Sequence, residues 1–315
     1  MYVLLQIGIL VISLVLLERG ADWLVEGASS LGERFHVSEL FIGLTVVAFG
    51  TSAPEFAVSL VGALQHKGGI AIGNVIGSNI ANIALILGIT LMMGKIVTKK
   101  KTLMYEIPFL IAVQLSATML FLKDGYFDYH DGIILLAFLA IFLVYAVSTS
   151  KSEFIEEVKE VEAPKKSLLS ASLLTIVGLA GVTAGGELGV YSAVNIARSL
   201  HVSETLIATT IVAFGTSVPE LATSLKAASK SKKDLALGNV IGSNMFNILG
   251  VLGVSSLFSR ISPDRNVNVD LLFMNGIGIL LFLIFLNRHR SAKGWKGVIL
   301  VVSYVLYIVY GIMMR

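Results

Sequence analysis

The 315-residue sequence contains no cysteine and few charged residues, and each shortage excludes a class of protein. Without cysteine the chain can form no disulfide, no thiolate metal site and no cysteine nucleophile. Only 14% of the residues are charged, against about 25% in soluble domains, so the chain has little polar surface to present to water. The motifs HExxH and Gly-x-Ser-x-Gly are also missing, so we expect neither an enzyme nor a bound cofactor.

Long apolar runs take the place of charge. Hydrophobic residues make up 55% of the chain, and the mean hydropathy is +0.84. The first run begins at Met1 without a basic region or a cleavage site, so we expect a retained span rather than a signal peptide. The composition predicts an all-α, multi-pass protein of the cell membrane, with the lipid bilayer around it and no nucleic-acid partner. Seven runs carry at most one charge each: 2–17, 40–64, 70–94, 107–122, 132–150, 205–225 and 271–286.

The sequence repeats itself at an offset of 165 residues. Residues 43–88 and 208–253 share 26 identities in 46 positions without a gap, and "GNVIGSN" at 73–79 returns unchanged at 238–244. Apolar composition alone does not produce such a match, so the chain is an internal duplication. We predict ten transmembrane helices, five in each half: 2–28, 39–64, 69–95, 103–123, 132–149, 168–196, 204–228, 234–258, 268–287 and 297–313.

An odd number of spans in each half places the two halves in opposite orientations. With both termini extracellular, the cytoplasmic loops hold 17 Lys and Arg residues and the extracellular loops hold six. Cytoplasmic loops are normally the more basic, so the count favours this orientation. We predict two inverted five-helix repeats, 1–150 and 168–315, joined by a charged cytoplasmic linker at 151–167 that is too short to fold alone.

The repeated motifs "GTSAPE" at 50–55 and "GTSVPE" at 215–220 place a carboxylate inside each apolar run. Pro54 and Pro219 lack an amide hydrogen, so each span should break beside them. Such a break frees backbone carbonyls, and non-helical backbone at membrane depth survives only where protein or water surrounds it. Glu55 and Glu220 follow the prolines, and a carboxylate at that depth normally faces a partner or an ion pathway.

Hard oxygen donors dominate both motifs. Carboxylates, hydroxyls, amides and freed carbonyls suit calcium, which takes six to eight oxygen ligands, whereas zinc and copper prefer the His and Cys that neither motif contains. A single motif could be a structural kink with tight packing, but its duplication argues against that reading. Broken helices at corresponding places of inverted halves indicate a central cation site for transport.

The two motif pairs, "GTSAPE…GNVIGSNIAN" and "GTSVPE…GNVIGSNMFN", resemble the alpha-repeats of the calcium/cation antiporter superfamily, in particular the prokaryotic sodium/calcium exchanger branch. In prokaryotic relatives an aspartate can stand where this chain has Asn247, so the site here carries a formal charge of −2. The resemblance implies that calcium binds Glu55, Glu220, Thr51, Thr216 and the carbonyls of Ala48 and Ala213. It implies sodium sites at Ser52, Ser78, Asn82, Ser217, Ser243 and Asn247.

The resemblance predicts an antiporter that exchanges Ca²⁺ for Na⁺ by alternating access and functions as a monomer. A proton/calcium antiporter on the same scaffold remains an alternative, although proton exchangers typically carry an acid in the second motif. A cation channel is disfavoured because it needs a continuous pore, usually built by symmetric subunits. Near the end of the first span, Glu18, Asp22 and Glu26 could line a gate or could mark a solvated helix end.

Overall fold

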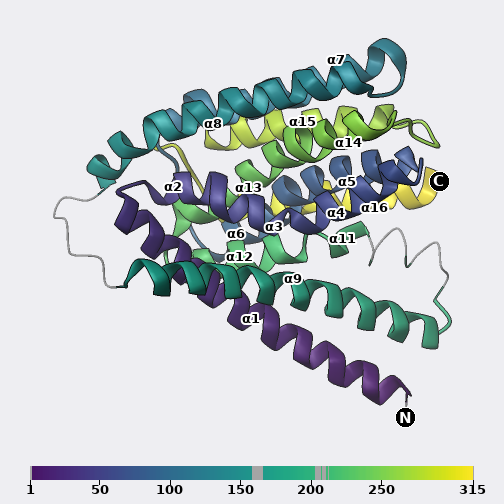
Figure 1. Cartoon of the computed structure of the whole chain (residues 1–315), viewed down its shortest axis with the longest axis horizontal. Helices are drawn as coiled ribbons and strands as arrows, with labels where there is room; N and C mark the ends of the chain where they lie inside the picture. Colours follow the sequence, from purple (N-terminus) through teal and green to yellow (C-terminus); the bar gives the residue numbers. More distant parts are fainter. Residues whose placement is uncertain (1, 158–165, 203–206, 208–210, 212, 315) are drawn as a thin grey trace.

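Two long helices, α1 (Tyr2–Phe35) and α9 (Leu168–Ser199), pack along each other on one side of a helical bundle (Figure 1). The computed structural model describes every residue except 1, 158–165, 203–206, 208–210, 212 and 315. Glycines allow the close approach of the two helices: a Cβ atom on Gly20 would lie 2.6 Å from the Val182 amide nitrogen. Such a small-residue surface lets the two helix backbones touch directly.

The centre of the bundle is formed by two buried helices that each contain a π-helical segment. The first consists of α5, η2 and α6, and the second of α13, η5 and α14, with every boundary displaced by 165 residues between the two. Internal π-helical segments are uncommon and often mark functional sites. Their bounds are α5 Gly68–Ile80, η2 Ala81–Leu87, α6 Gly88–Met93, α13 Lys233–Met245, η5 Phe246–Leu252 and α14 Gly253–Phe258.

The remaining long helices surround this centre and expose much of their apolar surface, as helices that face lipid do. Among them, α7 and α8 lie along the side of the bundle that is opposite α1 and α9 (Figure 1). Two short strands complete the chain. The bounds are η3 Thr102–Glu106, α7 Ile107–Asp124, α8 Tyr129–Glu157, α15 Asn268–Phe285, α16 Trp295–Met314, β1 Ile96–Val97 and β2 Ser291–Ala292.

Both predicted helix breaks are present. In the first half the chain bends by 47° between residues 39–51 and α4, with Ser52 at the bend. In the second half Thr216 and Ser217 separate α11 from α12. Proline occupies the first turn of the helix after each break, where its missing N–H costs nothing. The bounds are α2 Glu39–Ile42, η1 Gly43–Val47, α3 Ala48–Thr51, α4 Ala53–Leu64, α11 Ala213–Gly215 and α12 Val218–Ser229.

Within the described residues, eight helices are long and apolar enough to cross a membrane, or nine if the bent pair is one span. These nine coincide with nine of the predicted spans, although α1 continues to Phe35 rather than ending near residue 28. The tenth predicted span, 204–228, falls partly on residues outside the described part of the chain, as does the linker at 151–167. The helix count therefore does not confirm ten spans.

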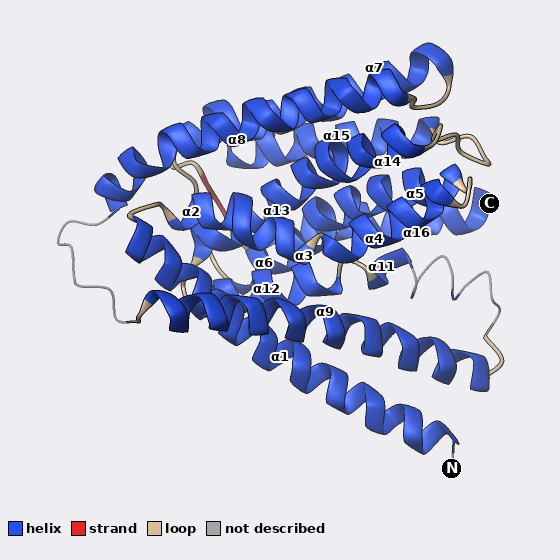
Figure 2. Ribbon diagram, in the orientation of Figure 1, coloured by secondary structure: helices blue, strands red, loops and turns tan. Residues whose placement is uncertain are grey.

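Two short backbone pairings lie at opposite ends of the bundle and are related by the repeat offset. Ile96 of β1 pairs with Ala292 of β2, and Phe127 pairs with Ile261. Adding 165 to each first-half position gives the second-half residue of the other pairing. Figure 2 shows the strand near the left end and the turn between α7 and α8 at the upper right. Loops of one half therefore meet loops of the other at both ends.

Candidate cation site

The two helix breaks bring Glu55 and Glu220 into the buried centre of the protein. Each glutamate lies in the first turn of the helix after its break, α4 or α12, and each is fully buried. The first turn of a helix carries a partial positive charge that favours a carboxylate. The two carboxylates are close enough to repel each other. A buried pair of this kind needs positive charge for compensation, which a bound cation supplies.

Each glutamate accepts a hydrogen bond from a serine of the opposite half. The Ser217 hydroxyl donates to Oε1 of Glu55 at 3.3 Å, and the Ser52 hydroxyl donates to Oε1 of Glu220 at 3.2 Å. These serines are themselves at most 3% exposed, so both bonds lie away from water. The structure therefore brings together four of the residues that the sequence singles out, as two reciprocal pairs.

The threonines of the breaks meet the second motif of the opposite half. Thr51 Oγ1 lies 3.5 Å from Ser243 Oγ, and Thr216 Oγ1 lies 3.5 Å from Ser78 Oγ. The Thr216 and Ser78 hydroxyls also interact with the Glu55 carboxylate. Four hydroxyls that are distant in the sequence thus gather around the two acids.

Four buried side chains present oxygen atoms with no hydrogen-bond partner among the described residues. They are Oε2 of Glu55, Oε2 of Glu220, and the amide oxygens of Asn82 and Asn247, whose amide nitrogens are also unpaired. All four side chains are fully buried. Leaving a buried polar group unpaired costs about 1–3 kcal/mol. Oxygen atoms held in this way fit a hard cation, and Asn82 and Asn247 lie within the π-helical segments η2 and η5.

The carbonyl of Ala48 differs from the expectation. It accepts the Ser52 amide at 3.0 Å and lies 3.4 Å from Thr51 Oγ1, so the break does not free it. The helix continues for one more residue than proline alone predicts, because the bend falls after Thr51. Ala213 begins α11, and in that half the Ser217 amide bonds to the Phe214 carbonyl instead, at 3.0 Å. Whether either alanine carbonyl binds a cation stays a prediction.

Two asparagines that sequence reasoning missed connect these groups. The Thr51 hydroxyl donates to Asn239 Oδ1 at 3.2 Å, and the Thr216 hydroxyl donates to Asn74 Oδ1 at 3.2 Å. Both asparagines belong to the repeated "GNVIGSN" and are 165 residues apart. Their identity within the repeat was the available signal, but the motif's glycines suggested helix packing and drew attention away from the neighbouring amides.

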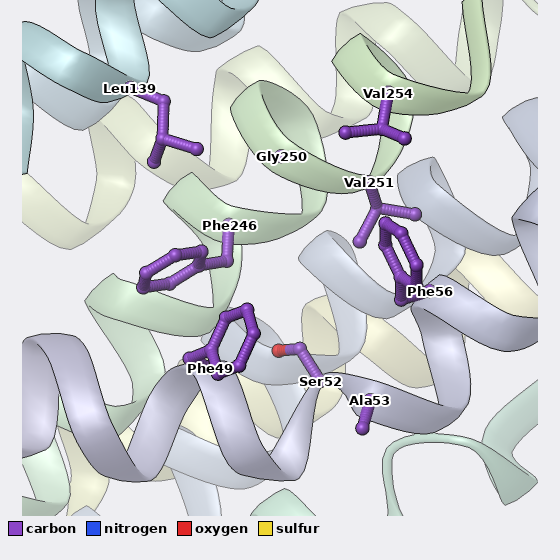
Figure 3. Close-up of a pocket in the computed structure, with 9 residues that line it drawn as sticks. All are labelled: Phe49, Ser52, Ala53, Phe56, Leu139, Phe246, Gly250, Val251 and Val254. Carbon is purple, nitrogen blue, oxygen red and sulfur yellow. The ribbon is translucent and has the colours of Figure 1, made fainter.

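Two cavities border the site on different sides. One of about 290 Å³ lies between the bend, α8 and η5, and Ser52 places the one hydroxyl among its described lining residues (Figure 3). Phe49, Phe56 and Phe246 form much of its wall. The other, of about 330 Å³, is lined by Thr216 and by Glu187 of α9. Ser52 and Thr216 are thus the site residues that line the cavities.

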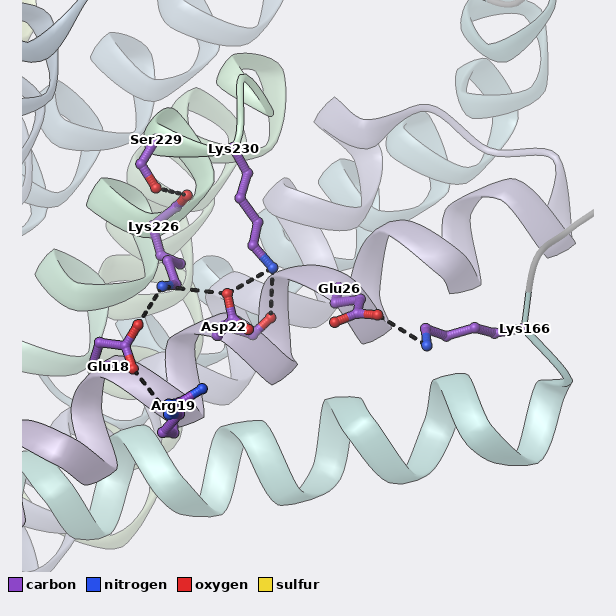
Figure 4. A network of polar contacts seen from close by, with 8 residues as sticks. All are labelled: Glu18, Arg19, Asp22, Glu26, Lys166, Lys226, Ser229 and Lys230. Atoms are coloured by element: carbon purple, nitrogen blue, oxygen red, sulfur yellow. Dashed lines mark hydrogen bonds and ion pairs between the residues drawn. The ribbon is translucent and has the colours of Figure 1, made fainter.

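An ion-pair network joins α1 to α12 beyond the site (Figure 4). Lys226 Nζ lies 2.6 Å from Oε1 of Glu18 and 3.3 Å from Oδ1 of Asp22, and Lys230 Nζ lies 2.7 Å from the same Asp22 oxygen. Glu26 pairs with Lys166 at 2.9 Å. Glu18 also pairs with its neighbour Arg19 at 3.3 Å. The acids near the end of α1 are therefore paired, chiefly with lysines that the sequence analysis had not linked to them.

Comparisons with known proteins agree with this geometry. The family model described as "Sodium/calcium exchanger protein" matches residues 5–148 and again 170–313, two segments offset by 165. An uncharacterized membrane protein of Methanocaldococcus jannaschii is 38% identical over 97% of both chains. The sodium/calcium exchanger MaX1 of Methanosarcina acetivorans is 31% identical over 96% of this chain and 97% of its own.

Solved structures show the same arrangement of helices. The sodium–calcium exchanger NCX_Mj, soaked with 2.5 mM Na⁺ and 0.1 mM Ca²⁺, superposes with a TM-score of 0.84 at 35% identity, and the match covers 97% of this chain and 98% of that chain. The same exchanger soaked without Na⁺ and Ca²⁺ gives a TM-score of 0.85. Identity and coverage of this extent place the likeness in the whole chain rather than in one motif.

Proposed function

Because the chain belongs to the sodium/calcium exchanger family, we propose that it is a secondary active antiporter that exchanges Ca²⁺ for Na⁺ across the membrane. One observation carries the proposal: two fully buried glutamates, each bonded to a serine of the opposite half, leave one carboxylate oxygen each without a protein partner. A site of charge −2 built from hard oxygen donors matches a calcium ion in charge and in ligand type.

In this proposal Ca²⁺ binds between the two breaks. Glu55 and Glu220 supply its charge compensation, and Thr51, Thr216 and the Ala48 and Ala213 carbonyls complete its oxygen ligands. The hydroxyls and amides just outside this shell form the sodium sites. Their reciprocal contacts across the two halves support a common centre. The proposed sodium ligands are Ser52, Ser78, Asn82, Ser217, Ser243 and Asn247.

We propose further that the chain has ten spans in two inverted repeats, 1–150 and 168–315, with both termini extracellular. The matched hydrogen bonds and the two end pairings support this arrangement, because each joins residues that exchange places under the 165-residue offset. In Figure 1 both termini lie at the right, whereas α8 ends and α9 begins at the left. The excess of basic loops assigns the left end to the cytoplasm.

Transport requires that the site open alternately to each side. The glycine-lined contact between α1 and α9 suits a sliding motion, since it lacks large side chains that interlock. The lysine network between α1 and α12 lies toward the proposed cytoplasmic end. Val61 and Gln65 stand at the repeat positions of Lys226 and Lys230, so the other end lacks the equivalent ion pairs. In the described conformation this asymmetry supports a closed cytoplasmic side.

The test is calcium uptake by purified protein in sealed vesicles. Vesicles loaded with sodium and diluted into sodium-free calcium buffer at constant pH should take up calcium far faster than sodium-free vesicles. A Glu55→Gln protein in matched vesicles provides the control for leak. Uptake driven equally well by a pH gradient without sodium would replace this proposal with proton/calcium exchange, and uptake that needs no counter-ion would indicate a channel.

A further inference from the structure

Asn239 makes three contacts that fix the direction of its amide. Its Nδ2 donates to Ser224 Oγ at 3.0 Å and to the Glu220 carbonyl at 3.5 Å, while its Oδ1 accepts the Thr51 hydroxyl at 3.2 Å. A backbone carbonyl can only accept, so the nitrogen must face Glu220 and the oxygen must face Thr51. The side chain is fully buried, so water does not compete for these bonds.

Asn74 makes the same three contacts in the other half. Its Nδ2 donates to Ser59 Oγ at 2.9 Å and to the Glu55 carbonyl at 3.0 Å, while its Oδ1 accepts the Thr216 hydroxyl at 3.2 Å. In both halves the nitrogen bonds within its own repeat and the oxygen bonds across to the opposite repeat. Each asparagine therefore links the backbone of one glutamate to the threonine that accompanies the other.

The direction of the threonine proton matters for cation binding. A hydroxyl binds a cation through an oxygen lone pair, so its hydrogen has to point to another acceptor. Asn239 and Asn74 supply that acceptor at a fixed place. Resting on the proposed function, we infer that Asn74 and Asn239 are positioning residues, which turn the hydroxyl protons of Thr216 and Thr51 away from the cation and hold each threonine in register with the opposite glutamate.

Removing the amide leaves the threonine with a poorer choice. In an Asn239→Ala protein, the remaining acceptor for the Thr51 hydroxyl on its own helix is the Ala48 carbonyl, 3.4 Å away. That carbonyl is itself a proposed calcium ligand, so the proton would then lie where the cation binds. We expect the calcium concentration for half-maximal exchange to rise about tenfold, as loss of one ligand-orienting hydrogen bond implies.

The test compares calcium half-saturation in sodium-loaded vesicles for wild type, Asn239→Ala, Thr51→Val and the double variant. If Asn239 acts through Thr51, the double variant should equal Thr51→Val alone, because the threonine that Asn239 orients is already gone. Ser224→Ala removes a contact of the same amide within its own repeat and should shift half-saturation less than about threefold. Asn195→Ala, on the exposed face of α9, is a control for asparagine loss in general.

Additive effects of Asn239→Ala and Thr51→Val would overturn the inference, as would a Ser224→Ala shift as large as that of Asn239→Ala. Melting temperatures of all variants separate loss of fold from loss of binding, and Asn74→Ala with Thr216→Val repeats the cycle in the other half. If Glu55→Gln transports calcium normally, the proposed function itself fails. If Glu55→Gln is inactive but Asn239→Ala leaves half-saturation unchanged, the positioning role alone is wrong.

Discussion

Ser52 donates a hydrogen bond to Glu220, 168 residues further along the chain, and Ser217 returns the contact to Glu55. Neither glutamate is bonded to the serine of its own motif by these contacts. A cation bound between the carboxylates would therefore touch both halves at once. Movement of either half would change the whole ligand set, which is what a site that binds and releases two kinds of ion requires.

Neutralising either glutamate should abolish calcium transport. Glu55→Gln and Glu220→Gln keep the side-chain size but leave a divalent ion half-compensated in a buried site, which costs about 3–5 kcal/mol. Calcium affinity should fall by about two to four orders of magnitude. Calcium uptake and the melting temperature of each purified variant check this. A folded Glu55→Gln protein with full exchange would show that the motif is structural.

The reciprocal serine contacts predict matched effects in the two halves. Ser52→Ala and Ser217→Ala each remove one hydrogen bond to a carboxylate, worth about 1.5–3 kcal/mol, and both should weaken sodium-dependent exchange about tenfold or more. Measuring the sodium dependence of exchange for both variants checks this. Ser303→Ala on α16, whose hydroxyl bonds its own helix, should behave as wild type. A large effect of one serine and none of the other would contradict the reciprocity.

The unpaired asparagines should contribute to function without contributing to stability. Asn82→Ala and Asn247→Ala remove buried amides that have no partner among the described residues, so neither change should lower the melting temperature by the amount usual for a lost hydrogen bond. Both should weaken the sodium dependence of exchange more than its calcium dependence. Thermal unfolding and ion titrations of flux measure the two effects. A marked loss of stability would mean that these amides are packed structurally.

The lysine network should respond to salt. Lys226→Ala breaks the contacts to Glu18 and Asp22, which are partly exposed, so the loss of stability should be small. It should also vanish at high salt, where exposed charges are screened within about 3 Å. Melting temperatures of both proteins at low and at molar salt provide the measurement. A loss that persists in molar salt would show that Lys226 acts by packing rather than by charge.

The proposed topology can be tested without first removing native thiols, because the chain has no cysteine. Single cysteines introduced within 151–167 should resist an impermeant thiol reagent in right-side-out vesicles, since that segment is expected to be cytoplasmic. A cysteine at Ser262, in a loop of the opposite end, should be labelled in the same vesicles. Rapid labelling of the linker and protection of Ser262 would reverse the orientation.

The sequence by itself determined the features that depend on local chemistry. Pro54 and Pro219 lack an amide hydrogen whatever surrounds them, so the breaks could be predicted beside them, and both are present. The apolar runs predicted nine helices that the structure contains. The 165-residue repeat predicted that Glu55 and Glu220 are equivalent. Each of these inferences needs only neighbouring residues or a comparison of the chain with itself.

Only the tertiary structure decided which groups meet. The pairing of Ser52 with Glu220, and of Thr51 with Asn239, depends on how the two halves pack, and a repeat offset gives equivalence without giving contact. The Ala48 carbonyl accepts the Ser52 amide because the bend falls one residue later than the proline argument implied. Lys226 reaches Asp22 because α12 crosses α1. Contacts between distant segments are set by packing of whole helices, which no local pattern records.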